Sequence, residues 1–148
     1  MSGRIEYRLD QATSAEILGH LKSCESAFNP PLGTRVDLEA YAKKIGAKAK
    51  RFEAWADGVL IGLVAAYCND PLGRDAYITS VSVLEAWRGE GIAGRLLDQC
   101  AGSARAAGFR RLRLEVGTRN SAAIQLYEKF GFAIEDEGPE LARMCLQL

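Results

Sequence analysis

The chain has 148 residues, of which 48% are hydrophobic and 26% charged, and its 19 basic and 19 acidic residues give a net charge of zero. This mixture suits a single domain over residues 1–148, which is long enough to bury its own core. The charge balance argues against a nucleic-acid or membrane partner. The polar N-terminus and the lack of a ~20-residue apolar run predict a cytoplasmic protein.

The first part of the chain changes from a strand pattern to helical patterns. Alternating residues predict a strand over Ile5–Leu9, and apolar spacing predicts a helix over Ala12–Ser23. A proline-containing stretch interrupts the pattern. Helical spacing resumes over Asp37–Ile45, and we expect Gly46 to end that second helix.

A strand meander is predicted in the middle of the chain. An Asp-Gly pair between the apolar runs Arg51–Trp55 and Val59–Cys68 indicates a hairpin. A turn-rich stretch follows, and the β-branched run Ala76–Leu84 predicts a third strand.

The remaining chain alternates between helix and strand. We expect helices over Gly91–Ala107 and Ser121–Phe130, with strands over Leu112–Val116, Phe132–Glu135 and Ala142–Leu146. The third meander strand, the following helix and the next strand form one right-handed crossover unit. The element order therefore predicts an α/β fold, a mixed sheet with helices on its faces.

Three glycines and two arginines lie where this crossover helix begins, in the run AWRGEGIAGRLL. Free backbone N–H groups and the helix dipole at such a turn attract phosphate, and glycine lets an anion approach the backbone. Arg88 and Arg95 would add charge-assisted hydrogen bonds. The alternative is a tight turn that needs glycine for its dihedral angles alone. The spacing matches neither a Walker loop nor the dinucleotide fingerprint, which argues against nucleotide hydrolysis and nicotinamide chemistry.

The pattern Arg88-x-x-Gly91-x-Ala93, after a strand that ends in SVSV, resembles the pyrophosphate loop of the GNAT superfamily of acyl-CoA N-acyltransferases. The stretch LEVGTRNSAAIQLYEKFGF is similar to that family's later strand, Asn-led helix and Tyr-x-Lys-x-Gly-Phe ending. The resemblance covers about Ala76–Phe132. It implies a GNAT-like central mixed, mostly antiparallel twisted sheet with helices on both faces, acetyl-CoA or coenzyme A as cofactor, and an amine acceptor. Dimerisation is common for this fold, and nothing in the sequence fixes it.

The resemblance implies that coenzyme A contacts the strand before the loop, the loop itself and the Asn-led helix. The residues concerned are Val81, Ser82, Val83, Arg88, Gly89, Glu90, Gly91, Ile92, Ala93, Gly94, Arg95, Asn120, Ala123, Tyr127 and Lys129. The pantetheine arm would pair with the strand backbone, and an N–H near Val83 would polarise the thioester carbonyl. Asn120 also suits a helix N-cap, and Lys129 also fits a solvated helix position.

Tyr127 matches the tyrosine that many members of this family use as the general acid for the departing thiolate. The structural alternative is a packed helix tyrosine, because it shares an apolar stripe with Ala123, Leu126 and Phe130. Both can hold, since a tyrosine can bury its ring and present its hydroxyl.

The general base is less clearly marked. Many relatives carry a glutamate on the strand before the loop, and AYITSVSV has none. Glu115 is the substitute, because some protein N-terminal acetyltransferases of this family use a glutamate in the same LEV context, at the same distance before the tyrosine. The alternative is a strand carboxylate paired with Arg113 or Arg111. Glu53 and an ordered water are further candidates for the base.

The resemblance places the acceptor site in the N-terminal helices and the loop between them. There Phe28 and Tyr41 would line a pocket, and Arg35 would meet a carboxylate or phosphate; an ordinary packed loop is the alternative. Prolines stiffen this loop, which favours a small amine, amino acid or amino sugar. A peptide α-amine is the second choice, suggested by the pairing of Glu115 with Tyr127, and a non-catalytic coenzyme A-binding module is the third reading.

The cysteines do not suggest a metal site. The chain has four cysteines, far apart and without a Cys-x-x-Cys pair, and one histidine. Cys100 lies on an apolar helix face, so we expect it to be a buried free thiol.

Overall fold

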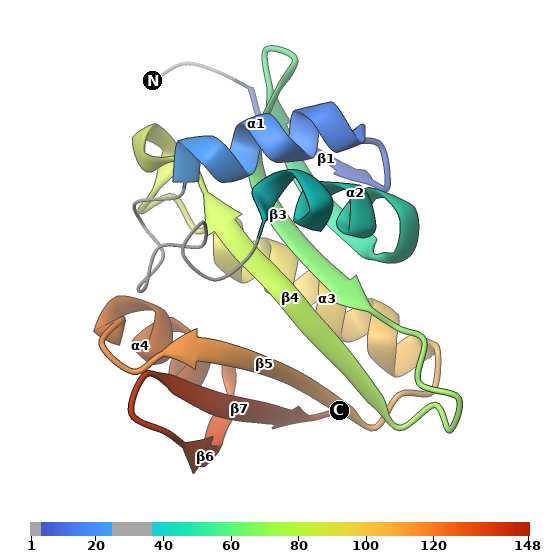
Figure 1. Cartoon of the computed structure of the whole chain (residues 1–148), viewed down its shortest axis with the longest axis vertical. Helices are drawn as coiled ribbons and strands as arrows, with labels where there is room; N and C mark the ends of the chain where they lie inside the picture. The colour runs from blue at the N-terminus through green and yellow to red at the C-terminus, as the bar shows by residue number, and fades with distance from the viewer. Residues whose placement is uncertain (1–3, 25–36) are drawn as a thin grey trace.

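The computed structural model describes residues 4–24 and 37–148, which form one seven-stranded sheet and the helices that cover it (Figure 1). The elements in chain order are β1 (Glu6–Leu9), α1 (Ser14–Cys24), α2 (Leu38–Lys48), β2 (Lys50–Ala56), β3 (Val59–Tyr67), β4 (Asp75–Val83), a 3-10 turn (Glu85–Trp87), α3 (Ile92–Ala106), β5 (Arg111–Gly117), α4 (Ser121–Phe130), β6 (Ala133–Glu137) and β7 (Leu141–Gln147).

The sheet is mixed and mostly antiparallel, as expected. Its strand order is β1-β2-β3-β4-β5-β7-β6, and among these neighbours only β4 and β5 run parallel. Helices α1 and α2 cover one face, and α3 and α4 cover the other (Figure 1). A core therefore lies on each side of the sheet. The predicted crossover unit is β4, α3 and β5.

The hairpin between β2 and β3 forms where the Asp-Gly pair predicts it. Asp57 and Gly58 have φ angles of 50° and 76°, the left-handed conformation that a tight hairpin turn requires. Cys100 is 1% exposed on α3, so the expectation of a buried free thiol is confirmed.

The predicted end of α2 is wrong, because the helix continues through Gly46 to Lys48. A Cβ added at Gly46 would lie 2.6 Å from the Ser14 Oγ atom on α1. This glycine therefore allows the two helices to approach each other, and it does not end the helix.

A β-bulge in β4 changes which side chains face each core. The β3–β4 register pairs Ala65 with Ser80 and Ala66 with Ile78, which leaves Thr79 as the extra residue. Before the bulge Ile78 faces the α3 side, and after it Val81 does. The side chains of Ser80 and Ser82, which alternate with the valines, consequently point toward α1 and α2.

Strands β4 and β5 separate beyond this bulge. Their pairing runs from Asp75 opposite Arg111 to Ile78 opposite Leu114, although both strands continue further. The two ribbons diverge visibly in Figure 1. The split removes hydrogen-bond partners from one edge of β4 and opens a gap in the middle of the sheet.

Helix α3 is held against β3 by a glycine contact. A Cβ added at Gly62 would lie 2.8 Å from the Ile92 Cγ2 atom and 3.3 Å from the Leu96 Cδ1 atom. We expect Gly62→Ala to lower the free energy of unfolding by about 1–3 kcal/mol through overpacking, measured by urea denaturation. The matched control is Gly19→Ala, where an added Cβ meets nothing within 4 Å and the helix gains propensity. Equal stability of Gly62→Ala and the wild type would contradict this packing account.

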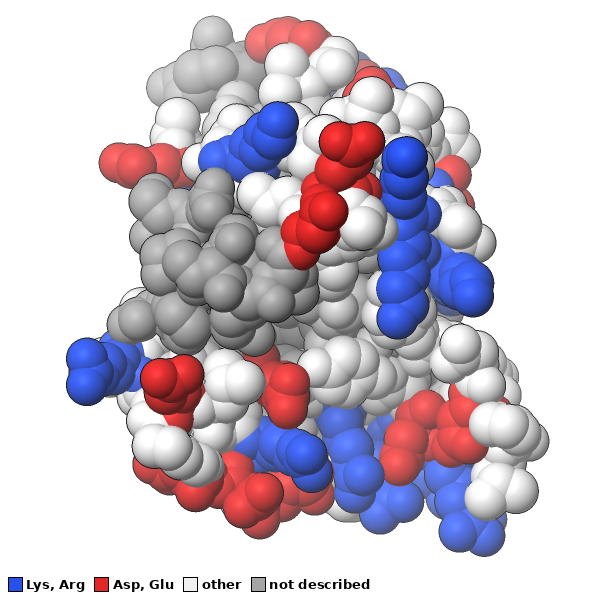
Figure 2. Space-filling view, in the orientation of Figure 1, with Lys and Arg blue, Asp and Glu red and all other residues white. Residues whose placement is uncertain are grey.

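Two further features concern the surface charge and the character of the helices. Acidic and basic side chains are interspersed on the face shown in Figure 2. Within residues 4–24 and 37–148, no helix has the length and apolar character needed to cross a membrane.

Candidate active site

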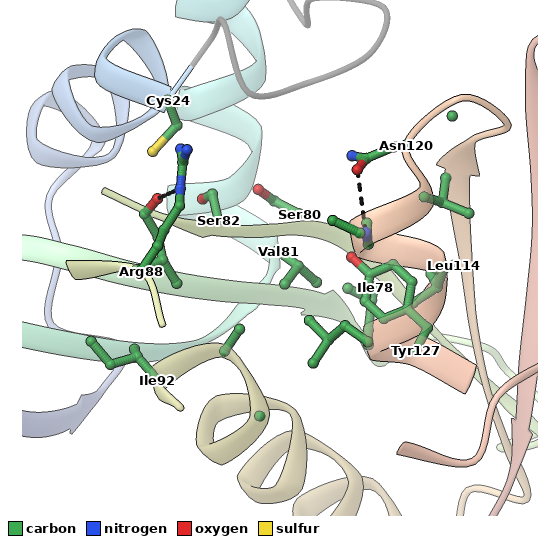
Figure 3. Close-up of a pocket in the computed structure, with 18 of the residues that line it drawn as sticks. Cys24, Ile78, Ser80, Val81, Ser82, Arg88, Ile92, Leu114, Asn120 and Tyr127 are labelled. Atoms are coloured by element: carbon green, nitrogen blue, oxygen red, sulfur yellow. Dashed lines mark hydrogen bonds between the residues drawn. The ribbon is translucent and has the colours of Figure 1, made fainter. Parts of the chain in front are cut away.

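A cavity of about 530 Å³ occupies the split between β4 and β5 and reaches both faces of the sheet (Figure 3). Its walls come from α1, α2, β4, the glycine loop, α3, β5, α4 and the start of β7. Most of the site residues proposed from the sequence lie in these walls: Tyr41, Val81, Ser82, Val83, Arg88, Gly89, Gly91, Ile92, Ala93, Gly94, Glu115, Asn120, Ala123 and Tyr127.

Three other proposed residues that the structure describes are not found in the cavity wall. The Arg95 guanidinium lies over the Tyr7 ring, 4.1 Å from its centroid. Glu90 and Lys129 are exposed. Two acceptor candidates from the N-terminal loop lie outside the described residues, namely Phe28 and Arg35.

The glycine loop presents unpaired backbone amides to the cavity. Gly89 and Gly91 have φ angles of 84° and 78°, and Gly91 begins α3 without a side-chain cap. None of the amides from Gly89 to Gly94 donates to another described residue, and the first paired amide is that of Arg95, which donates to the Gly91 carbonyl at 3.1 Å. Positive φ therefore explains two of the glycines, and the free amides remain available to an anion.

The split leaves part of the β4 backbone facing the gap. The Leu84 N–H donates to the Ile61 carbonyl of β3 at 2.8 Å. Because successive residues of an antiparallel strand point their backbone groups to opposite sides, Ser82 turns its backbone toward β3, whereas Val81 and Val83 turn theirs toward the gap. An extended ligand in the gap can thus pair with the two valines, whereas the Ser82 side chain points to the sheet face that α1 covers.

Arg88 occupies the end of the cavity nearest α1. Its Nε atom donates to the Val83 carbonyl at 3.1 Å, and the guanidinium extends toward Cys24 (Figure 3). The arginine therefore adds positive charge next to the loop amides and the β4 edge.

Tyr127 combines a packed ring with an available hydroxyl. The residue is 7% exposed on α4, and its ring makes an edge-to-face contact with Phe132 at a centroid distance of 5.8 Å. Burial raises the pKa of the Tyr127 hydroxyl above its usual value. This hydroxyl donates to none of the described residues, so a protonated donor is free within the cavity wall.

Asn120 caps the helix that carries Tyr127. Its Oδ1 atom accepts from the Ala123 amide at 3.2 Å, which confirms the predicted N-cap. The same residue lies in the cavity wall, so capping and ligand contact are compatible.

Glu115 extends from β5 on the face opposite to Leu114. Its side chain is 34% exposed, accepts from the Tyr77 hydroxyl at 3.3 Å and forms an ion pair with Arg143 at 3.6 Å. Glu115 belongs to the cavity wall, and both of its carboxylate oxygens already have a partner.

The structural alternative for Glu115, a carboxylate paired with Arg113 or Arg111, has a different partner in the structure, namely Arg143. Arg111 and Arg113 pair with Asp75 instead, at 2.7 and 3.3 Å. The reason is the strand order: β7 inserts next to β5 and places Arg143 directly opposite Glu115.

Glu53 has a structural role. Its carboxylate is fully buried and accepts from the Gln11 and Ala12 amides and from the Trp55 Nε1 atom at 3.0–3.1 Å. It does not belong to the cavity wall, so it is not placed to deprotonate a substrate.

Tyr41 joins α2 to the β4 bulge. Its hydroxyl donates to the Thr79 carbonyl and lies 2.7 Å from the Thr79 Oγ1 atom. The tyrosine proposed as an acceptor-site residue therefore also holds the strand where it splits.

Sequence reasoning did not anticipate His20 next to the cavity, nor Ser80 in its wall. His20 on α1 is 4% exposed, and its Nε2 atom lies 2.8 Å from the Ser82 Oγ atom. A signal was present, because His20 shares a helical face with Ile17, Leu21 and Cys24. This spacing predicts that the histidine is buried. It does not predict the hydrogen-bond partner, Ser82, which lies on a distant strand.

Fold and cavity together define an acyl-transferase architecture, a split mixed sheet with a glycine loop of unpaired amides beside the split. The sequence profile of the acetyltransferase (GNAT) family matches residues 16–132, and the chain belongs to that family. The resemblance stated from the two motifs is confirmed.

Similar proteins agree with this assignment. The chain is 35% identical over 104 residues to an IAA acetyltransferase of Azospirillum brasilense, covering 70% of this chain and 64% of that protein. It is 40% identical over 67 residues to the uncharacterized N-acetyltransferase YdgE of Bacillus subtilis, covering 44% and 43%. The matches thus span less than two thirds of these relatives. The structure of YncA, a putative acetyltransferase from Salmonella typhimurium with its cofactor acetyl-CoA, is 21% identical with a TM-score of 0.76, covering 97% of this chain and 94% of that one.

Proposed function

We propose that the protein is an acetyl-CoA-dependent N-acetyltransferase that acetylates a primary amine of a small molecule by direct attack in a ternary complex. One observation carries the proposal: Tyr127, whose hydroxyl is free, lines the same cavity as five loop residues with unpaired amides, namely Gly89, Gly91, Ile92, Ala93 and Gly94. Membership of the GNAT family and the acetyl-CoA bound by YncA support the choice of cofactor.

Each part of coenzyme A has a matching feature. The diphosphate accepts from the loop amides, with Arg88 adding charge. The pantetheine arm pairs with the backbone of Val81 and Val83 along the open edge of β4. The thioester carbonyl then lies in the split, where a backbone N–H near Val83 stabilises the developing oxyanion.

Acetyl transfer then needs proton donors and acceptors. The amine nitrogen attacks the carbonyl carbon, the C–S bond breaks, and the Tyr127 hydroxyl protonates the leaving sulfur. We assign Glu115 to attracting the cationic amine and accepting its first proton. Glu115 belongs to the cavity wall, and its side chain, 34% exposed, lies on the sheet face that α1 and α2 cover.

A peptide α-amine is the second candidate acceptor. It is favoured by the occurrence of Glu115 and Tyr127 in the same cavity wall, in the arrangement that suggested an N-terminal acetyltransferase. A small amine remains the first choice on the sequence argument alone, because two consecutive prolines between α1 and α2 favour a defined pocket over an open peptide groove.

The test has two stages. Thermal unfolding is measured with coenzyme A first; ligand at 100-fold excess over its dissociation constant stabilises by about 2.7 kcal/mol, so we expect a clear rise in Tm. Thiol release from acetyl-CoA is then followed across amines, amino acids, amino sugars and peptides. Faster release with small amines supports the proposal. No shift at millimolar coenzyme A contradicts the cofactor site, and a shift without thiol release identifies a coenzyme A-binding module.

A further inference from the structure

We propose that Ser82 and His20 form a proton relay for the acceptor amine. The Ser82 hydroxyl takes a proton from the attacking nitrogen and passes its own proton to the His20 Nε2 atom. This inference rests on the acetyl transfer proposed above, and it assigns a catalytic role to Ser82 and a positioning role to His20 behind it.

The hydrogen bonds of the imidazole define its tautomer. The His20 Nδ1 atom lies 2.9 Å from the Leu60 carbonyl, which can only accept, so Nδ1 carries the proton. Nε2 is then an acceptor, and the Ser82 hydroxyl donates to it at 2.8 Å. A hydroxyl, an imidazole acceptor and a backbone group that orients the imidazole are the parts by which enzymes activate a hydroxyl.

The relay lies where an acceptor can reach it. Ser82 is 8% exposed and belongs to the cavity wall, while His20 lies behind it on the buried face of α1. Ser80 lies in the same wall, on the same side of β4 (Figure 3). The Ser80 hydroxyl is buried and has no hydrogen-bond partner within the described part of the chain. Because buried polar atoms are normally paired, this hydroxyl marks a position for a polar atom of a ligand.

The groups around His20 favour its neutral form. Burial lowers the pKa of His20, with the hydrogen bonds to Leu60 and Ser82 opposing the shift. On its own helix the Cys24 sulfur lies 3.8 Å from Nε2; burial raises the pKa of that thiol, and Arg88 beyond it opposes the rise. These groups therefore favour the uncharged imidazole. Its Nε2 atom lies closer to the Ser82 Oγ atom, at 2.8 Å, than to the Cys24 sulfur, at 3.8 Å.

The proposed step balances. An amine that has lost its first proton attacks, the N–C bond forms, and the C–S electron pair goes to sulfur. The nitrogen proton moves to the Ser82 Oγ atom, the serine proton moves to Nε2, and Tyr127 protonates the sulfur. When products leave, the proton on His20 returns through solvent to the tyrosinate, and Glu115 releases the first amine proton to solvent.

The experiment uses the fact that His20 is the single histidine of the sequence. In protein labelled with ¹⁵N-histidine, NMR reports one imidazole, and we expect the proton on Nδ1 and titration below the usual His pKa of about 6.5. The value of kcat/KM should decrease on the acid side with that same midpoint, because a protonated imidazole cannot accept the Ser82 proton.

Three variants separate the relay from a structural role. Ser82→Ala and His20→Gln should each lower kcat by about 100-fold, with unchanged affinity for coenzyme A, and Ser82→Thr should restore most of the rate. His20→Gln keeps polar atoms but cannot take a proton, so its acid limb should vanish. The matched serine control is Ser103→Ala, since its hydroxyl only accepts from Lys50 at the surface.

Opposite results overturn the relay. These are a proton on Nε2 in the free protein, or a His20→Gln variant that retains both the wild-type kcat and the acid limb. If His20→Gln fails to fold, Ser82→Ala decides by the same readouts. Failure of the proposed function gives a different result, because the wild-type protein would then release no thiol with any amine. Without acetyl transfer there is no proton for the relay to carry, so that result overturns the relay as well.

Discussion

Replacing Tyr127 with phenylalanine is expected to lower kcat for acetyl transfer by 100-fold or more, with the dissociation constant of coenzyme A changed less than about twofold. The ring contact with Phe132 survives the substitution, so the helix should stay in place. Only the hydroxyl is lost, and burial keeps that hydroxyl protonated and able to donate to the leaving thiolate.

Steady-state thiol release and calorimetric titration of coenzyme A measure the two quantities. Tyr7→Phe is the matched control, because it removes a hydroxyl from β1 outside the cavity and keeps the ring beneath Arg95. A Tyr127→Phe variant with wild-type turnover would show that the tyrosine is only a packing residue.

Charge introduced at Gly91 is expected to have the second large effect. Asparagine and aspartate tolerate the φ of 78° at this position better than other side chains, and an added Cβ meets nothing within 4 Å. Gly91→Asn should weaken coenzyme A binding by about 10-fold through the bulk of its side chain. Gly91→Asp should weaken it by about a further 10-fold, because a carboxylate opposes the diphosphate at a helix N-terminus.

The comparison of these two nearly isosteric variants isolates electrostatics from shape. Dissociation constants are measured by calorimetry at low and high salt. The difference between the variants should shrink as salt rises, since screening weakens repulsion at the exposed mouth of the cavity. Equal affinities at low salt would contradict an anion site at the loop.

The strong sequence patterns predict most of the fold correctly. The hairpin at Asp57, the crossover helix and the Asn-led helix follow from local chemistry: a turn that needs φ > 0, a helical apolar stripe and a cap. The loop motif lies where a strand and a helix meet, so its position beside the cavity also follows from local order.

Features that depend on contacts between distant residues were not predictable in the same way. The sequence predicts that Gly46 ends a helix, but the glycine is explained better by its close approach to Ser14 on another helix. The Glu115 partner depends on which strand lies next to β5. The Ser82–His20 contact depends on the bulge in β4, which changes the sheet face to which the following side chains point. Local spacing carries no information on these pairings.

Some site residues remain predictions from the sequence. Phe28 and Arg35 belong to the N-terminal loop, outside the described residues. The phosphate contact predicted for Arg95 requires its guanidinium to leave the Tyr7 ring, and that of Lys129 requires an exposed side chain to reach the cavity.

The most direct measurement compares amide chemical shifts of ¹⁵N-labelled protein with coenzyme A and with pantetheine, which has no diphosphate. With coenzyme A, the amide signals of Gly89–Gly94 should move together with those of Val81 and Val83. With pantetheine, only the two valines should respond. Glycine-loop signals that stay fixed on saturation with coenzyme A would contradict a diphosphate held by these amides.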